Sequence, residues 1–482
     1  MKQKHTIFIA CLLATGLTSC EAWLSEVPFD KVAGNELYTT EQGVQEALNG
    51  LYLGMTDRSI YGGELTFGFI EALAQHYYIS SDHRYEDPAA YNYSTSRSRG
   101  YFDAAWERLY GLITSANVFL EQVEANKQRY SPARYNLFRG EALALRVYFH
   151  FDLLRLFAPP CTEENKAKRA IPYYDKEMNA PADYLTVEKV TGRLLADISE
   201  AITLLAADPV LEGLATGDGF WEYRNFRLNL YAAHVLKARV LLHSGDKPGA
   251  YAIASALLGG TLPGSGESVN FMKIFPSILS VLPGFQEPVM YPEIIFGLHD
   301  VNRSRVQRDY FNTDLTAETL LLAGNARYIA LFTNNDDIRG KGFVEATNQN
   351  STHPLRAIVK YRQGTPLAAD PLPYRYEILP LIRKSEVYLI AAEASDNDTD
   401  KARWLELLRL ERGYLQNNTG AYASSLDQLV QEEYDREFYG EGQYFYFLKR
   451  NGKTTIPDQL NKNVTIGSFT LPVPDKETYN RQ

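Results

Sequence analysis

Several aromatic residues lie in polar segments of the chain, where their rings could bind a ligand. Residues 76–101 carry six tyrosines among Asp, His, Arg and Asn side chains, and five of them are candidates. Two later segments carry four more aromatic candidates. An aromatic ring offers a flat apolar face that can stack on the C–H face of a sugar, while neighbouring polar groups bind hydroxyl groups. The candidate ligand-binding residues are Tyr77, Tyr78, Tyr85, Tyr91, Tyr93, Trp221, Tyr291, Tyr310 and Phe311. For any one ring, packing inside the protein is the simpler interpretation, so the prediction concerns the loops as groups.

The acidic residues near the C-terminus do not have the arrangement of a hydrolase site. Glu432, Glu433, Glu437 and Glu441 fall on one predicted helix, where ion pairs and helix caps explain them. A glycosidase needs two carboxylates that face each other across the bond to be cleaved. The sequence contains neither a Gly-x-Ser-x-Gly nor a His-Glu-x-x-His motif. We therefore expect a protein that is not an enzyme.

Two polar segments could suggest a metal site, but neither has the required ligand pattern. His76 and His83 lie near two aspartates, and solvated loop side chains explain this grouping more simply. Asn334–Arg339 superficially resembles a calcium loop, but Ile338 stands where an oxygen ligand is required and the terminal Glu is missing. The sequence therefore predicts no metal and no cofactor.

The first twenty residues have the order of a bacterial secretory signal. Lys2 and Lys4 precede the apolar run Ile7–Leu17, which is too short for a permanent membrane span, and Leu17-Thr18-Ser19-Cys20 follows. These last four residues resemble a lipobox, in which the cysteine is acylated and becomes the mature N-terminus. The alternative is an ordinary cleaved signal with a chance cysteine. We expect a signal peptide at 1–19, lipid on Cys20, and a protein tethered to a membrane outside the cytoplasm.

Composition restricts the possible partners. The predicted signal removes two Lys from the 49 basic residues, which leaves 47 basic and 59 acidic side chains and a net charge of −12. An acidic excess argues against nucleic acid, because phosphate binding needs a basic surface. Cys161 is the one cysteine left beyond Cys20, so no intramolecular disulfide is expected. No later run is long and apolar enough for a transmembrane helix.

The apolar periodicity is mainly helical, and these helices must position the candidate residues. Predicted helices cover residues 37–53, 106–123, 135–157 and 187–205. Two helix pairs, at 231–258 and 382–414, have small residues where the helices approach and a short turn between them, which is typical of tetratricopeptide units. Residues 260–380 are rich in Pro, Gly, Asn and Asp, with strand-like runs at 293–298 and 357–361. Loops of this length on a rigid frame are usually functional.

Eight short segments occur in a characteristic order behind the predicted lipobox. They are Trp23–Pro28, Glu41–Tyr52, Glu141–Phe157, Ile171–Pro172, Asn229–Asp246, Leu379–Glu393, Arg436–Arg450 and Leu471–Pro474. Together they resemble the SusD/RagB family, the surface lipoproteins of Bacteroidetes nutrient-uptake systems. Two departures mark a divergent branch. Tyr444 and Phe447 stand where members often carry Arg and Asp, and Leu407–Gly413 differs from the usual Asn-x-x-Arg-x-Arg-Ala-Gly motif.

The resemblance implies a mainly α, SusD-like α/α fold, in which irregular tetratricopeptide-like helix pairs support a loop-rich lobe with a few short strands. It implies a helical N-terminal part at 20–260 and a C-terminal part at 261–482 that holds the lobe and the closing helices. Structural calcium occurs in the family, and this sequence does not indicate it.

The resemblance also implies a function without catalysis. Family members are outer-membrane lipoproteins that face the cell exterior, capture an oligosaccharide and deliver it to a SusC-like TonB-dependent barrel transporter. Two alternatives remain open. The same architecture could bind peptides or another nutrient, or, less favoured, the helix pairs could serve as a tetratricopeptide-type adaptor between proteins.

Overall fold

The computed structural model describes residues 36–177, 180–217, 219–281, 289–346, 352–363, 374–414 and 425–479. The predicted signal peptide and Cys20 lie outside the described residues. Within those ranges, every helix is too short or too polar to cross a lipid bilayer.

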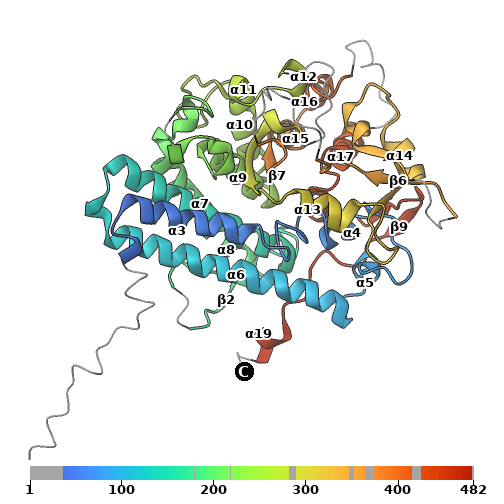
Figure 1. Cartoon of the computed structure of the whole chain (residues 1–482), viewed down its shortest axis with the longest axis horizontal. Helices are drawn as coiled ribbons and strands as arrows, with labels where there is room; N and C mark the ends of the chain where they lie inside the picture. The colour runs from blue at the N-terminus through green and yellow to red at the C-terminus, as the bar shows by residue number, and fades with distance from the viewer. Residues whose placement is uncertain are drawn as a thin grey trace, which may run out of the picture.

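Helices dominate the described chain, as the sequence predicts (Figure 1). The longer helices are α3 (Glu41–Met55), α6 (Ser96–Ala125), α7 (Pro132–Phe157), α8 (Val187–Leu204), α9 (Leu230–His243), α10 (Lys247–Leu258), α15 (Lys384–Ala394), α16 (Asp398–Leu410) and α17 (Leu426–Glu437). The shorter helices are α4 (Phe69–Leu73), α5 (Glu86–Ala89), α11 (Phe271–Ile274), α12 (Ile278–Val281), α13 (Ser304–Val306), α14 (Asn325–Leu331), α18 (Tyr444–Arg450) and α19 (Asp475–Tyr479).

The long helices begin at polar residues that cap the first turn. Thr95 and Ser131 accept hydrogen bonds from backbone N–H groups of α6 and α7, and Pro132 occupies the first position of α7. Asn229 caps α9 in the same way, and Asp246 caps α10. Ser244–Asp246 joins these two helices in a tight turn, so the predicted helix pair at 231–258 is confirmed.

From α6 onward, each long helix packs on the next long helix along the chain, across the short helices that lie between some of them. The packed pairs run in order: α6 with α7, α7 with α8, α8 with α9, α9 with α10, α10 with α15, and α15 with α16. Figure 1 shows α3, α6 and α8 lying along one side, with α9, α10, α15 and α16 above them. The main hydrophobic core extends from Tyr38 to Leu471. Residues on both sides of position 260 share it, and the division into two parts at that position stays a prediction.

Short strands occur mostly in the predicted loop-rich lobe. β3 (Ile294–His299) pairs antiparallel with β7 (Ile378–Arg383), and the sheet β4-β6-β5 and the hairpin β8-β9 lie farther along the chain. The remaining strands are β1 (Arg169–Pro172), β2 (Tyr184–Thr186), β4 (Leu322–Gly324), β5 (Phe343–Glu345), β6 (Leu355–Ile358), β8 (Thr455–Pro457) and β9 (Asn463–Thr465). Both predicted strands, at 293–298 and 357–361, are therefore found as β3 and β6, with ends that differ by one to three residues.

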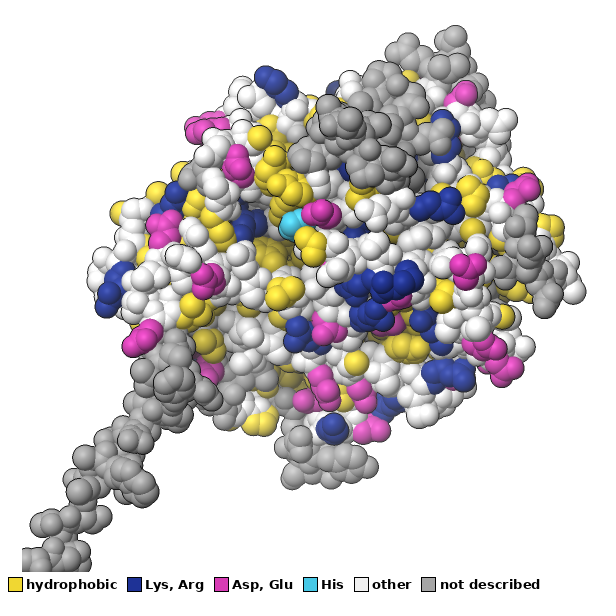
Figure 2. Space-filling view, in the orientation of Figure 1, with side chains coloured by type: hydrophobic (Ala, Val, Ile, Leu, Met, Phe, Trp, Pro, Cys, Tyr) yellow, Lys and Arg dark blue, Asp and Glu magenta, His cyan; other side chains and the backbone are white. Residues whose placement is uncertain are grey.

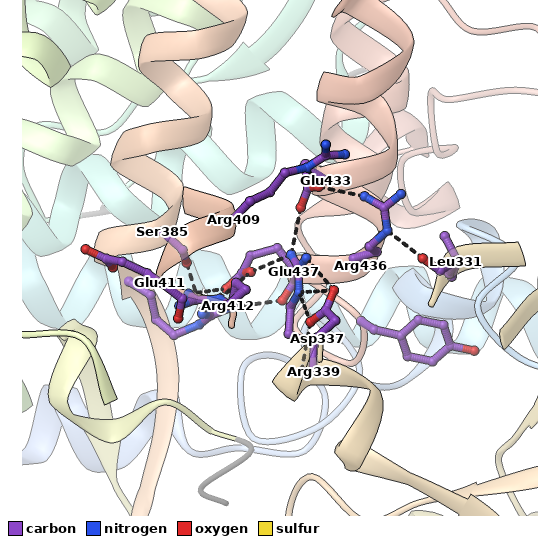
Figure 3. Close-up of polar contacts among 12 residues, drawn as sticks. Leu331, Asp337, Arg339, Ser385, Arg409, Glu411, Arg412, Glu433, Arg436 and Glu437 are labelled. Atoms are coloured by element: carbon purple, nitrogen blue, oxygen red, sulfur yellow. Dashed lines mark hydrogen bonds and ion pairs between the residues drawn. The ribbon is translucent and has the colours of Figure 1, made fainter. Parts of the chain in front are cut away.

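A buried network of ion pairs joins the lobe to the helices. Figure 3 shows Glu437, at the end of α17, between Arg412 and Arg339. Arg412 donates to Glu437 at 2.8 and 2.9 Å, and Arg339 donates to it at 3.0 Å. Burial opposes ionisation of Glu437, but the charges of Arg412 and Arg383 outweigh it and hold its pKa well below the usual range.

The other acidic residues of the C-terminal cluster are paired as well. Glu433 binds Arg339, Arg409 and Arg436, and Glu432 binds Arg436. Glu441 lies beyond the end of α17 and binds Arg383, so the prediction that all four glutamates share one helix is wrong for this residue. The interpretation of the cluster as ion pairs is confirmed.

Candidate functional site

Six of the nine predicted ligand-binding rings are buried in the core. Tyr85 donates a hydrogen bond to Glu64 at 2.9 Å, Tyr77 donates to the backbone oxygen of Phe67 at 2.9 Å, and Trp221 packs against Phe138. The buried six are Tyr77, Tyr85, Trp221, Tyr291, Tyr310 and Phe311, each at most 6% exposed. The prediction that these rings form exposed platforms is wrong, because they fill space between helices and loops.

The other three predicted rings, Tyr78, Tyr91 and Tyr93, are half-buried. Tyr91 donates its hydroxyl to the backbone oxygen of Leu73 at 2.9 Å, and Tyr93 donates to that of Ser468 at 2.5 Å. These two hydrogen bonds hold the loop that carries Tyr91 and Tyr93 against Leu73 and Ser468. A ligand-binding role for the three rings stays a prediction.

The two histidines considered for a metal are separated. His76 is buried, with its ring nitrogens 2.6 Å from Glu71 and 3.1 Å from Asp435. His83 is also buried, and burial and the charge of Arg84 lower its pKa to about 4. Among the described residues, no group of three or more His, Cys, Asp or Glu side chains is placed to hold a metal ion.

Four rings that the sequence did not single out form a partly exposed cluster, here called the aromatic patch. Phe226 stacks on Tyr223, with ring centres 5.8 Å apart, and on His299, with ring centres 5.0 Å apart. Tyr374 meets all three rings edge-on, at 5.1 to 5.6 Å, and is 41% exposed. The rings come from three segments of the chain that the fold brings together.

Two members of the patch have an unusual backbone conformation. Tyr223 has a φ of 48° and Tyr374 a φ of 65°, both in the left-handed region that residues with a side chain seldom adopt. Such conformations cost about 1–3 kcal/mol and tend to occur at functional sites, where the surrounding structure enforces them. Their presence at two facing rings favours a role in binding over simple packing.

Buried charges hold the 3-10 helix Arg224–Phe226, which carries part of the patch. The Arg224 guanidinium is fully buried and donates to Asp208 at 2.9 and 3.0 Å and to Glu141 of α7 at 2.8 Å. A guanidinium that binds two carboxylates fixes both distance and orientation. Phe226 is therefore presented by a rigid support.

The other side of the patch rests on the β3–β7 pair. His299 ends β3, and its Nε2 lies 2.7 Å from Glu377, which precedes β7. The backbone N–H of Asp300 donates to the backbone oxygen of Glu377 at 2.6 Å. This hydrogen bond keeps Tyr374 and its neighbours beside β3. The Glu377 carboxylate thus fixes the plane of the His299 ring that faces Phe226.

A polar cavity of about 560 Å³ adjoins the patch, and His299 lines both. Its wall includes three arginines, each already paired: Arg305 with Asp300 at 3.1 Å, and both Arg58 and Arg308 with Asp309. Leu53 and Val301 also line the cavity and are 73% and 69% exposed. Figure 2 shows hydrophobic side chains and a histidine beside a group of Lys and Arg side chains on this face.

This arrangement suits a ligand that has both polar groups and apolar faces. The aromatic patch supplies ring faces and edges, and Asn302, Ser304 and the arginines of the cavity supply hydrogen-bond donors. The cavity volume lies within the ~300–1,000 Å³ that small-molecule sites usually occupy.

Two family models match the chain. One, described as starch-binding and associating with the outer membrane, matches residues 28–214, and one described as the SusD family matches residues 299–481. The chain belongs to the SusD family. The resemblance to the SusD/RagB family is therefore confirmed, and so is the mainly helical fold class.

Solved structures of the family share the fold of the chain. A SusD superfamily protein from Bacteroides thetaiotaomicron is similar with a TM-score of 0.70 and 20% identity, covering 91% of this chain and 97% of that chain. A SusD-like carbohydrate binding protein from Bacteroides vulgatus gives 0.67 and 17%, covering 91% and 95%. Surface glycan-binding protein A from Bacteroides thetaiotaomicron, in complex with laminarihexaose, gives 0.62 and 16%, covering 91% and 97%. No curated protein is significantly similar in sequence.

Proposed function

We propose that the chain is a cell-surface lipoprotein that captures an oligosaccharide at the aromatic patch and delivers it to a SusC-like TonB-dependent transporter. The observation that carries this proposal is the partly exposed patch of four rings joined to a polar cavity at His299, in a chain of a family described as starch-binding. Sugar rings offer C–H faces to aromatic rings and hydroxyl groups to polar side chains. The aromatic patch and the polar cavity could therefore bind these two kinds of group on one oligosaccharide.

Catalysis is not part of the proposal. Asp57 and Asp300 line the cavity and pair with Arg108 and Arg305, and Asp309 pairs with two arginines of the wall, Arg58 and Arg308. For Asp309, burial opposes ionisation, but the hydrogen bond from Arg308 and the charge of Arg58 outweigh it and lower the pKa. A glycosidase needs a carboxylic acid with a raised pKa opposite a second carboxylate. Asp309, with its lowered pKa, does not meet that requirement.

Binding to variants of the patch tests the site. Tyr374→Ala and Phe226→Ala should each weaken the binding of an oligosaccharide by about fivefold, since one ring contact contributes about 1 kcal/mol. Isothermal titration with laminarihexaose and with starch-derived oligosaccharides measures this change. Tyr184→Ala, which removes a half-buried tyrosine on β2, is the control and should bind like the original chain. Equal affinity of the patch variants and the control would exclude the patch as the site.

The lipid anchor and the transporter are tested separately. Cys20→Ala should abolish incorporation of labelled fatty acid and release the protein from the membrane fraction, because the predicted lipidation site is removed. Retained label would contradict the anchor. Purification of the tagged chain from membranes of its native cell should bring down a TonB-dependent barrel, and its absence under conditions that keep the membrane complex intact would contradict delivery to such a partner.

A further inference from the structure

A second, larger cavity lies in another part of the fold. Its volume is about 660 Å³, and its wall comes from α14, α17, the start and end of α18 and the hairpin β8-β9. It shares no lining residue with the cavity beside the aromatic patch. The C-terminal helices that supply most of this wall lie toward the right side of Figure 1, with α14 and α17 close together.

The acidic groups of this second cavity are paired with basic side chains in its wall or next to it. Arg327 of α14 pairs with Asp435 of α17, and His76 holds the other carboxylate oxygen of Asp435 at 3.1 Å. Glu432 pairs with Arg436 at 2.9 Å. A charged ligand would have to separate these pairs, at a cost that its own contacts would need to offset.

The remaining charges of the wall are also balanced. Asp427 pairs with Lys401 at 2.5 Å, and a hydrogen bond from Lys401 together with the charges of Lys401, Lys247 and Lys453 lowers its pKa. Lys453, which lines the cavity, therefore interacts electrostatically with the Asp427 carboxylate. The wall as a whole favours a ligand without net charge.

The groups left for a ligand are amides and hydroxyls. Gln431 donates its amide N–H to the Tyr444 hydroxyl at 3.2 Å, which leaves its carbonyl oxygen to accept. Asn461 accepts from Arg327 at 3.3 Å, which leaves its NH₂ group to donate. Thr455 and Asn463, at the start of β8 and β9, add a hydroxyl and a second amide at the rim. The wall thus offers both donors and acceptors, as a polyhydroxyl ligand requires.

The wall is held in place before any ligand arrives. Tyr444 is buried and stacks on the His76 ring, with ring centres 5.0 Å apart and the planes 1° from parallel. Asp458 accepts from the backbone N–H groups of Leu460 and Lys462 at 2.9 and 2.8 Å and closes the β8-β9 turn that carries Asn461. Fixed partners reduce the entropy lost on binding.

We infer that this second cavity is a separate binding site for a neutral saccharide, with Gln431, Asn461 and Asn463 as its hydrogen-bonding residues. The saccharide class is that of the proposed function, on which this choice of ligand rests. The apolar side chains of Ala330, Leu331 and Pro457 in the same wall offer contacts for the C–H face of a sugar ring. The chain would then hold a glycan at two separate places, at the patch and at this cavity.

Titration with variants at each site tests the inference. The probes are glucose, galactose, mannose and N-acetylglucosamine, their common disaccharides, and laminarihexaose. The original chain should bind at least one probe at a site that Gln431→Leu or Asn463→Leu weakens by about tenfold or more, the loss of one or two hydrogen bonds. Tyr374→Ala should leave this binding unchanged. Asn463 is exposed, so its variant serves where Gln431→Leu lowers the melting temperature.

The outcomes separate the two sites. Binding that survives Tyr374→Ala and is lost in Asn463→Leu supports the second site, even when the patch binds nothing and the proposed function fails there. Binding that only Tyr374→Ala removes would overturn the second site and leave the patch. No binding of any probe would also overturn it.

Discussion

His76 should make the stability of the protein depend on pH in the alkaline range. Its ring is stacked between Tyr439 and Tyr444, with centres 4.3 and 5.0 Å away, and both ring nitrogens lie within 3.1 Å of a carboxylate. Burial favours the neutral ring, but the charge of Glu71 and the hydrogen bond with Asp435 outweigh it and raise the pKa of His76 to about 9.

The sign and size follow from the two pKa values of His76. In the unfolded chain the pKa is about 6.5, so the protonated ring stabilises the folded state fully below pH 6.5. This stabilisation is lost as the pH rises from about 6.5 through about 9. The difference between 6.5 and about 9 corresponds to about 3 kcal/mol of unfolding free energy.

Urea unfolding of the original chain and of His76→Gln at pH 6.5 and 9.5 measures the effect. The original chain should lose about 3 kcal/mol more than His76→Gln between these two values, because groups other than His76 titrate in both proteins. An equal loss in the two proteins would refute the assignment of the charge to His76.

His83→Gln is the matched control for this experiment. Burial and the charge of Arg84 lower the pKa of His83 to about 4, so its contribution has the opposite dependence and is lost as the pH falls from about 6.5 through about 4. The His83 variant should therefore keep the alkaline loss of the original chain and differ from it only on the acidic side.

Three further substitutions test the packing by chemical and thermal unfolding. Arg412→Ala should lower the unfolding free energy by about 3–5 kcal/mol, because two buried carboxylates lose a partner, while the Lys166→Ala control at the exposed pair with Glu163 should leave it nearly unchanged. Gly442→Ala should cost at least about 1–3 kcal/mol, because φ is +73° and the new Cβ would lie 2.2 Å from the backbone oxygen of Leu65. Lys449→Met should cost about 1–3 kcal/mol, because the buried ammonium group donates to several backbone oxygens at 2.6 to 2.9 Å. Unchanged unfolding curves would contradict the structural role given to each residue.

The helices could be predicted from the sequence because their signals are local. The run 135–157 has an apolar face at helical spacing, and the structure places α7 at Pro132–Phe157. The pair at 231–258 was found from small residues and a Ser-Gly-Asp turn, and the structure places α9 and α10 there. In both cases neighbouring residues in the chain decide the conformation.

The aromatic site could not be predicted in this way. Tyr85 and Tyr310 are surrounded by polar residues in the sequence, yet their rings are buried by segments far away in the chain. The patch depends on contacts among Phe226, His299 and Tyr374, which only the tertiary fold brings together. Left-handed backbone at a tyrosine also has no sequence signal, since glycine or asparagine is the usual residue there.

The charged residues fall between these two cases. The glutamates of the C-terminal cluster could be interpreted as ion pairs because they lie along a predicted helix rather than facing each other across a site. Their partners could not be named. Arg339 and Arg412 come from loops about 25 to 100 residues away in the chain and reach Glu437 only in the folded protein.

The central claim is that the purified chain binds oligosaccharides without changing them. Isothermal titration of the chain with a panel of oligosaccharides and of peptides of similar length, followed by chromatography of the recovered ligand, tests this claim most directly. We predict saturable binding of at least one oligosaccharide, recovered intact, and no binding of the peptides. Binding of peptides alone, or recovery of a shortened oligosaccharide, would contradict it.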